Sequence, residues 1–225
     1  MTNTLNVLIA EDEPLIISIV TRALHEISRY YKIRHCNIKS VTDYDATLRE
    51  INEAFNTSPF DLIVLDTNVN VSNDELLDCC KNISAGLKTN FPDTKVIVLT
   101  SCSNNYKIHN ILKSLNPDGL LIRSDIDFDE LLKALSSVLN NAPYYSRAIL
   151  KLIRLHISND FSLDHIDRQL LYQLSIGTTM KYLPKVIPLS KSAIELRKRN
   201  LKALFLVEKE SDRSLVLKAK QHGFI

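Results

Sequence analysis

The chain is poor in glycine, with only four among 225 residues, and no glycine-rich loop that could cradle a phosphate is present. No apolar run approaches the length needed to cross a bilayer, and the N-terminus lacks a basic stretch followed by an apolar segment. We therefore expect a cytoplasmic protein without a membrane partner. No Ser/His/Asp order and no histidine spacing typical of metal ligands is visible, which argues against an independent metabolic enzyme.

Composition places the chain among globular proteins. Hydrophobic residues make up 45% of the sequence and charged residues 24%, and the length suits one large domain or two ordinary ones. The four cysteines form no zinc-type pair of pairs, and two of them are adjacent. We expect them to be reduced packing residues rather than a disulfide framework or a metal site: Cys36, Cys79, Cys80 and Cys102.

Charge is divided unevenly along the chain. Residues 1–140 hold 13 Lys and Arg against 19 Asp and Glu, whereas residues 141–225 hold 15 against 7. Such an asymmetry indicates two different tasks, with the basic part facing a polyanion. The alternative is a chance segregation of surface charge.

The first 140 residues alternate apolar runs with helical patterns. Apolar runs predict strands at 6–10, 32–38, 61–66, 95–100 and 119–122. Apolar residues at helical spacing predict helices at 16–27, 48–55, 75–87, 106–115 and 128–139. This alternation predicts an α/β fold: a doubly wound, five-stranded parallel sheet with helices on both faces.

Asn140-Asn141-Ala142-Pro143 breaks the last of these helices and marks a domain boundary. Beyond it no strand pattern is visible. The spacing predicts a linker helix at 146–157, followed by a small all-α domain. Helices of this domain are expected at 164–176, at 191–205 and at 212–221, and a short helix that ends near Pro184 is expected between the first two. A short helix, a turn and a basic second helix form the helix-turn-helix arrangement. The predicted domains are therefore 1–140 and 161–225, joined by a linker helix within 141–160.

Carboxylates stand where two of the predicted strands end. Glu11 and Asp12 follow the apolar run 6–10, and Asp66 closes the run 61–66. If these strands are neighbours, the three side chains converge at the carboxyl edge of the sheet, where open α/β sheets bind ligands. Three carboxylates in one crevice repel one another unless a cation joins them, and oxygen ligands suit Mg²⁺. The alternative is an ordinary acidic loop cluster.

With these motifs in chain order, residues 1–140 resemble the receiver domain of a two-component response regulator. Residues 160–225 resemble the LuxR-type helix-turn-helix of the NarL/FixJ subfamily. The resemblance implies a flavodoxin-like receiver in which Glu11, Asp12 and Asp66 hold Mg²⁺ with the backbone carbonyl of Asn68. It makes Asp66 the phosphoacceptor, a nucleophile toward a phosphohistidine. Thr100 matches the hydroxyl that contacts the phosphoryl group.

Several positions depart from the receiver pattern. Arg123 stands where a lysine is usual; it keeps the charge and can clamp a phosphate, but its planar fork differs from an ammonium. Leu120 takes the place of the aromatic switch residue, and the loop 67–74 lacks the customary Met-Pro and glycine. Ser101 is the rival for the switch hydroxyl, but Thr100 directly ends the strand.

The predicted helix 191–205 carries the DNA-binding expectation. Ile194, Leu201, Leu204 and Phe205 form a stripe expected to face inward. The resemblance and the outward charges give a set of DNA-binding candidates: Lys191, Ser192, Glu195, Leu196, Lys198, Arg199 and Lys202. Glu195 either accepts from a cytosine or pairs with Arg199 four residues on. For any single basic residue, a solvated charged face is the alternative.

We therefore expect a response regulator that a sensor histidine kinase phosphorylates and that binds double-stranded DNA as a homodimer to regulate transcription. In one alternative, DNA binding is independent of phosphorylation, and the receiver serves only as a dimerisation or interaction module. In another, the basic domain binds an acidic protein. Salt distinguishes the last alternative, because DNA binding weakens steeply as counterions compete.

Overall fold

The fold is taken from a computed structural model, which describes residues 1–225 except 1–3, 34, 55–56, 68–75, 102–103 and 158–162. The chain divides into two compact units, one of residues 1–103 with 110–150 and the other of residues 104–109 with 151–225. Among the helices within these described ranges, none is both long and apolar enough to cross a membrane. Each unit is described by itself.

The first unit is built on a parallel sheet whose strands follow the order β2-β1-β3-β4-β5-β6. The strands are β1 (Thr4–Ala10), β2 (His35–Val41), β3 (Leu62–Asp66), β4 (Lys95–Thr100), β5 (Gly119–Ile122) and β6 (Tyr144–Tyr145). All five residues of β3 and all four of β5 are buried, as expected for central strands covered on both faces. In this order, β1 and β3 are hydrogen-bonded neighbours, with Ala10 paired to Leu65.

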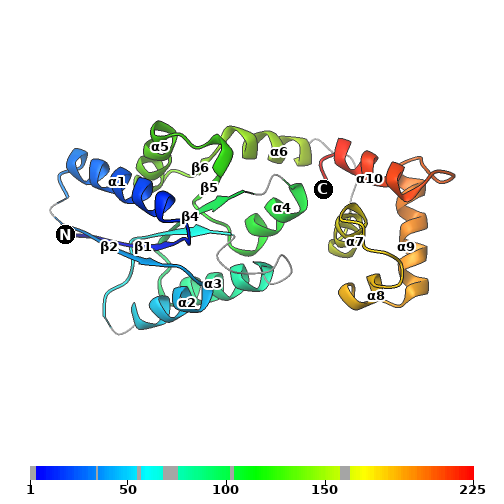
Figure 1. The fold of residues 1–225 in the computed structure, drawn as a ribbon, viewed down its shortest axis with the longest axis horizontal. Coiled ribbons are helices and arrows are strands. Elements are labelled where there is room, and N and C mark those ends of the chain that lie inside the picture. Colours follow the sequence, from blue (N-terminus) through cyan, green and yellow to red (C-terminus); the bar gives the residue numbers. More distant parts are fainter. Residues whose placement is uncertain (1–3, 34, 55–56, 68–75, 102–103, 158–162) are drawn as a thin grey trace. The chain divides into compact units, whose positions relative to one another are not determined.

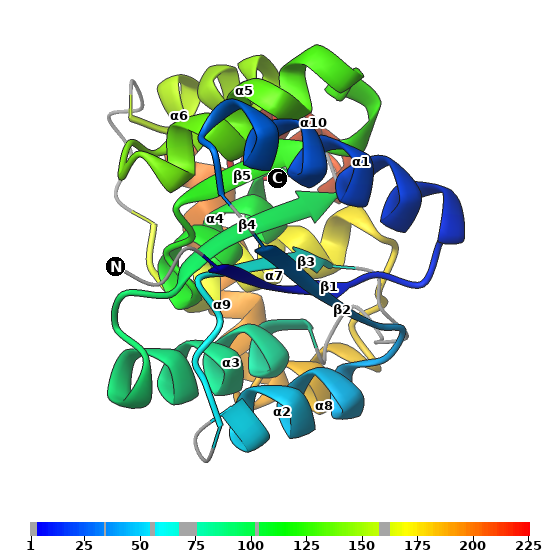
Figure 2. The same cartoon turned by 90° about the vertical axis from the view of Figure 1, so that its left-hand side faces the viewer.

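Helices cover both faces of this sheet (Figure 1). They are α1 (Pro14–Tyr30), α2 (Tyr44–Glu53), α3 (Leu76–Asn90), α4 (Asn105–Ser114) and α5 (Phe128–Leu139). Helices α1 and α5 lie together on one face, with α2 and α3 on the other, as the turned view in Figure 2 also shows. Their apolar sides pack into the core: Ala23 and Leu24 of α1 and Leu131 and Leu135 of α5 are at most 1% exposed.

Short polar side chains begin several of these helices. Asp43 accepts a hydrogen bond from the backbone N–H of Ala46 at the start of α2, and Asp127 accepts one from Glu130 at the start of α5. Each aspartate satisfies a backbone donor that the helix itself leaves without a partner. Pro14 opens α1, where its missing N–H costs nothing.

The predicted doubly wound parallel sheet is confirmed, with two corrections. The sheet has a sixth strand, β6, which pairs with β5 although no strand was expected beyond residue 140. Two residues are too few to give an alternating pattern, so the sequence carries no signal for it. The second strand runs from His35 to Val41 rather than from 32 to 38, because its apolar and polar residues alternate and blur its ends. The predicted domain limits stay predictions.

The second unit is helical. Its helices are α7 (His165–Ser175), α8 (Leu183–Val186), α9 (Lys191–Leu204) and α10 (Asp212–Gln221), and α6 (Arg147–Ile157) precedes them. A core of apolar side chains joins α7, α9 and α10 through Leu170, Leu171, Ile194, Leu201 and Leu215. The expected helices at 191–205 and 212–221 are thereby confirmed to within one residue.

Turn and cap residues set the limits of these helices. Gly177 has a positive φ of 85°, and the N–H groups of Gly177 and Thr178 bond back to Leu174 and Gln173, which ends α7. Ser190 accepts from the N–H of Ala193 and begins α9. The short helix was expected to end near Pro184, which is wrong: Pro184 lies in the first turn of α8, where proline fits.

Candidate functional site

The acidic side chains lie at the carboxyl ends of β1 and β3. Asp66 is the last residue of β3, and Glu11 follows β1, with its N–H bonded to the carbonyl of Val41 at 2.9 Å. One ligand atom from each of Glu11, Asp12 and Asp66 lies within 4.8 Å of the others. Glu11 and Asp66 are buried and Asp12 is exposed. The predicted convergence of the three carboxylates is therefore confirmed.

Arg123 reaches this cluster from the end of β5, where the short 3₁₀ helix η2 (Arg123–Asp125) begins. Its Nη2 forms an ion pair with Glu11 Oε2 and lies 3.1 Å from Asp66 Oδ2. Its Nη1 lies 2.7 Å from Glu13 Oε1. The guanidinium side chain is only 15% exposed. One cation therefore joins three carboxylates from the loop after β1 and the end of β3.

The electrostatics of this group favour the charged arginine. Burial alone would lower the pKa of Arg123, but the hydrogen bond to Glu11 and the charges of Asp66, Glu11 and Glu13 raise it above its ordinary value. Two of the three carboxylates beside it, Glu11 and Asp66, are buried, so water screens their charges poorly. The ion pairs compensate a desolvation cost that would otherwise be several kcal/mol for each ion.

Strand β6 and the residue after it hold β5 in place. The N–H of Tyr144 bonds to the carbonyl of Asp118, and the N–H of Ser146 bonds to the carbonyl of Leu120. The hydroxyl of Ser146, which is fully buried, accepts from the N–H of Ile122 at 3.4 Å. These bonds fix the carboxyl end of β5, from which Arg123 extends.

Thr100, the expected switch hydroxyl, is fully buried at the end of β4. The hydroxyl of Thr67 donates to the hydroxyl of Thr100 at 2.9 Å, and the N–H of Thr67 bonds to the carbonyl of Leu99. Thr67 follows Asp66 directly, so this pair links the end of β3 to the end of β4. The rival Ser101 is exposed. The role of Thr100 remains a prediction.

The donor chemistry of the acidic cluster fits Mg²⁺. Carboxylate oxygens are hard ligands, and Mg²⁺ in proteins is held by one or two carboxylates together with waters and phosphate oxygens. Glu11, Asp12 and Asp66 supply such oxygens within reach of one cation. Asn68, the fourth expected ligand, lies outside the described residues, as does most of the loop 67–74.

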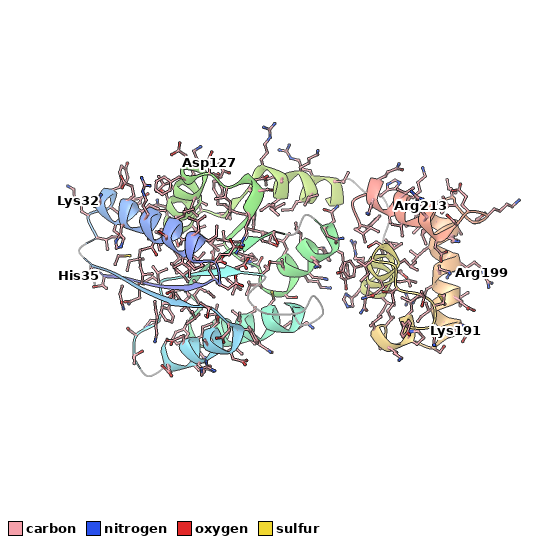
Figure 3. The ribbon with its side chains drawn as sticks, in the orientation of Figure 1. Lys32, His35, Asp127, Lys191, Arg199 and Arg213 are labelled. Atoms are coloured by element: carbon pink, nitrogen blue, oxygen red, sulfur yellow. The ribbon has the colours of Figure 1, made fainter. Side chains whose placement is uncertain are left out.

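Helix α9 carries the expected DNA-binding residues. Exposed side chains run along one side of it: Lys191, Ser192, Glu195, Leu196, Arg199 and Asn200. Arg199 lies on the side turned away from α7 (Figure 3). The inward stripe is confirmed for Ile194, Leu201 and Phe205, but Leu204 is 39% exposed and was placed wrongly, because it lies at the end of the helix.

Two of the expected contacts to DNA lie in a different setting. Lys198 and Lys202 both form ion pairs with Asp212, at 3.0 and 2.9 Å, and Lys202 also donates to the carbonyl of Glu210. Burial raises the pKa of Asp212, but the hydrogen bonds and charges of Lys202 and Lys198 outweigh it, so the net pKa is lowered. These lysines therefore join α9 to the start of α10, and any contact they make with a polyanion competes with Asp212.

Arg197 and Asn200 were absent from the expected set. Arg197 bonds to Asp164 and Asp167 of the α7 region, each at 2.7 Å, which fixes α9 against α7. Asn200 is exposed beside Leu196 and Arg199, and an asparagine can bond an adenine edge at two points. Helical spacing places Asn200 with the candidate positions 192, 196 and 199, so the sequence did contain a signal for Asn200. Among the described residues, no ion pair joins Glu195 to Arg199.

No protein-family model matches the chain, and no curated protein matches it. Solved structures do resemble it over almost its whole length. A structure of the Salmonella typhimurium RcsB response regulator aligns with a TM-score of 0.54 at 19% identity, covering 97% of this chain and 98% of that chain.

Two further structures contain RcsB with DNA. One, of two RcsB dimers bound to two parallel DNAs, aligns with a TM-score of 0.59 at 18% identity and covers 97% of this chain and 98% of that chain. The other is RcsB of Salmonella enterica serovar Typhimurium bound to the promoter P1flhDC with the phosphomimetic BeF3⁻. It aligns with a TM-score of 0.58 at 18% identity, covering 96% and 98% of the two chains. The chain therefore has the two-part fold of these response regulators.

Proposed function

We propose that this protein is a two-component response regulator. A sensor histidine kinase phosphorylates Asp66, and the helical unit binds double-stranded DNA as a homodimer to regulate transcription. The observation that carries the proposal is the gathering of Glu11, Asp12 and Asp66 around one point at the carboxyl ends of β1 and β3. The RcsB structures supply the second support, since they combine the same fold with bound DNA.

Asp66 provides the attacking atom. One of its carboxylate oxygens forms a bond to phosphorus while the bond from phosphorus to the imidazole nitrogen of a phosphohistidine breaks, and the nitrogen keeps the electron pair. Glu11, Asp12, Asp66 and the backbone carbonyl of Asn68 would hold Mg²⁺. When bound, the ion supplies positive charge to the transferring phosphoryl oxygens. Thr100 and Arg123 are the groups that would meet the phosphoryl group afterwards, by a hydroxyl donor and a charged fork.

Helix α9 suits a major groove. Lys191 and Arg199 are exposed cations that can contact phosphates, and Ser192, Glu195, Leu196 and Asn200 are exposed on the same helix. Arginine and asparagine can each bond a base edge at two points, and leucine can contact a thymine methyl. The excess of basic residues in 141–225 supplies the sequence-independent attraction to DNA.

Phosphodonor labelling tests the receiver half. The full chain should take up one phosphoryl group from a small-molecule phosphodonor in Mg²⁺ and far less in a chelator. Asp66→Asn, which keeps the size of the side chain but removes the nucleophile, should take up none. An intact protein that stays unlabelled in Mg²⁺ would remove the phosphorylation step from the proposal.

Salt-titrated binding to genomic fragments tests the helical half. Binding should weaken steeply with salt, because each phosphate contact releases counterions. It should also select a subset of fragments, and Arg199→Ala should reduce both the affinity and the selection. Flat salt dependence, or equal retention of all fragments, would favour an acidic protein partner instead of DNA.

A second candidate is a DNA-binding regulator that acts without phosphorylation, with the receiver as a dimerisation module. The observation that favours it is the contact of Arg123 with both Asp66 and Glu11, which supplies a cation to the acidic cluster from within the chain. An unchanged oligomeric state and DNA affinity after full phosphorylation would support this candidate over the first.

A further inference from the structure

We propose that Arg123 is a tethered counter-ion that competes with Mg²⁺ for Glu11 and Asp66, so that metal binding requires its guanidinium to leave these carboxylates. The inference rests on the proposed function, since it concerns the same Mg²⁺ site. It adds a property of this chain: metal affinity is set by an arginine built into the site. Four features of the described residues lead to it.

Both carboxylate oxygens of Glu11 are already engaged. Its Oε1 accepts from the backbone N–H of Glu13 at 3.0 Å, and its Oε2 pairs with Nη2 of Arg123. The side chain is 1% exposed, so no open edge of this carboxylate faces solvent. A metal ion that takes Oε2 of Glu11 therefore has to displace the guanidinium or share this oxygen with it.

The same nitrogen of Arg123 also lies 3.1 Å from Asp66 Oδ2. Nη2 thus stands between the two buried carboxylates, at the position where a bridging cation would neutralise both. A metal ion that took Oε2 of Glu11 and Oδ2 of Asp66 would compete with this nitrogen for the same two oxygens, by space as well as by charge.

Charge makes the exclusion stronger. A guanidinium and a divalent cation held against the same carboxylates repel each other, and the repulsion is weakly screened because Glu11 and Asp66 are buried. The pair therefore behaves as two ligands with negative coupling. Coupling of this kind changes affinity by roughly 5- to 150-fold in proteins.

Glu13 gives the displaced arginine a place to stay. It is bound to the other terminal nitrogen, Nη1, at 2.7 Å, and its side chain is 58% exposed at the rim of the cluster. The planar fork lets Arg123 hold the buried pair with one nitrogen and the rim with the other. A lysine has a single ammonium and cannot hold both places at once.

Calorimetric titration of Mg²⁺ into the metal-free full chain at neutral pH tests the proposal. Arg123→Gln should bind Mg²⁺ on the order of tenfold more tightly than the wild type. Arg123→Lys, which keeps the charge without the fork, should lie between the two. The matched control is Lys95→Gln, which removes an ion pair to Asp118 at the amino ends of β4 and β5, at the opposite edge of the sheet. It should bind Mg²⁺ like the wild type.

Thermal melting adds a second readout in case Arg123→Gln folds poorly. Mg²⁺ should raise its melting temperature more than it raises that of the wild type, because the ion replaces the missing cation. Equal or weaker Mg²⁺ binding by Arg123→Gln, including no detectable heat, would overturn the proposal, and Arg123→Lys equal to the wild type would overturn the role of the fork. None of these readouts involves phosphate transfer. A lack of label on Asp66 would therefore count against the proposed function, whereas an unchanged Mg²⁺ affinity would count against the role of Arg123.

Discussion

The two units of this protein each place one charged residue between two or three of opposite sign, and the central residue is more exposed in the second unit than in the first. In the first unit, Arg123 joins Glu11, Glu13 and Asp66, and its own side chain is only 15% exposed. In the second, Asp212 joins Lys198 and Lys202, and its side chain is 40% exposed. The carboxylates of Glu11 and Asp66 are too deeply buried to turn to water, whereas the carboxylate of Asp212 is exposed enough to do so.

This difference suits different tasks. Buried carboxylates that depend on a cation are poised for a change of cation or for a new charge at the same point. Lys198 and Lys202 share one partly exposed carboxylate, so they give up little when they move to another anion, such as a phosphate. The comparison therefore predicts large effects when the Arg123 group is broken and small effects when the Asp212 group is broken.

The largest effect is expected from Arg123→Met. Removing the cation leaves Glu11 and Asp66 buried with uncompensated charge, which typically costs 3–5 kcal/mol, so we expect a loss of roughly 3 kcal/mol. Urea unfolding of the first unit in a chelating buffer measures it, with Lys95→Met as the matched control at the other edge of the sheet. A loss no greater than that of the control would show that the Arg123 group is not a buried, strongly coupled site.

An intermediate effect is expected from Arg199→Ala in DNA binding. The side chain is exposed on α9, and we expect an affinity loss of about tenfold for a fragment that the full chain selects. Lys202→Ala should cost less, on the order of twofold, because Lys202 is already engaged by Asp212 and the carbonyl of Glu210. Fluorescence anisotropy at one fixed salt concentration compares them, and the reverse order would place Lys202 rather than Arg199 at the groove.

The smallest effect is expected from Asp212→Asn, with a loss of less than about 1 kcal/mol in the stability of the helical unit at neutral pH. Because the folded pKa of Asp212 is lowered, its contribution is complete above the ordinary carboxyl pKa and is lost as pH falls through the folded value. Melting temperatures of wild type and variant should therefore differ at pH 7 and converge in strong acid. A difference that grows on acidification would contradict the assignment.

The sequence pattern was enough to predict the carboxylates at the strand ends, because an apolar run followed by acidic residues marks both the strand and its carboxyl end. Glu11, Asp12 and Asp66 were expected together and lie together. The ion-pair partners of Arg123 could be predicted only in part from the sequence. Its match to the phosphoryl-binding position gave no indication that it pairs with Glu11 and Glu13. Those pairs depend on the direction of a long side chain across two strands, which spacing does not encode.

The helical unit shows the same limit. Caps such as Ser190 and the turn at Gly177 are local signals, and the helices they bound were expected correctly. Lys198 and Lys202 of α9 pair with Asp212 of α10, and a loop separates these two helices in the sequence. The charges on α9 alone do not show this pairing, and we therefore expected both lysines to contact DNA. Strand β6 was not predicted, because its two tyrosines are too few to form an alternating apolar and polar pattern.

The central claim is that the carboxylates at the ends of β1 and β3 make Asp66 a phosphoacceptor. Mapping the phosphoryl group by mass spectrometry of peptides, after phosphodonor treatment in Mg²⁺, tests it most directly. The account predicts a single added phosphoryl group on the peptide that contains Asp66, absent from Asp66→Asn and reduced in a chelator. A phosphoryl group on any other residue of the wild type, or its persistence in Asp66→Asn, would contradict the account.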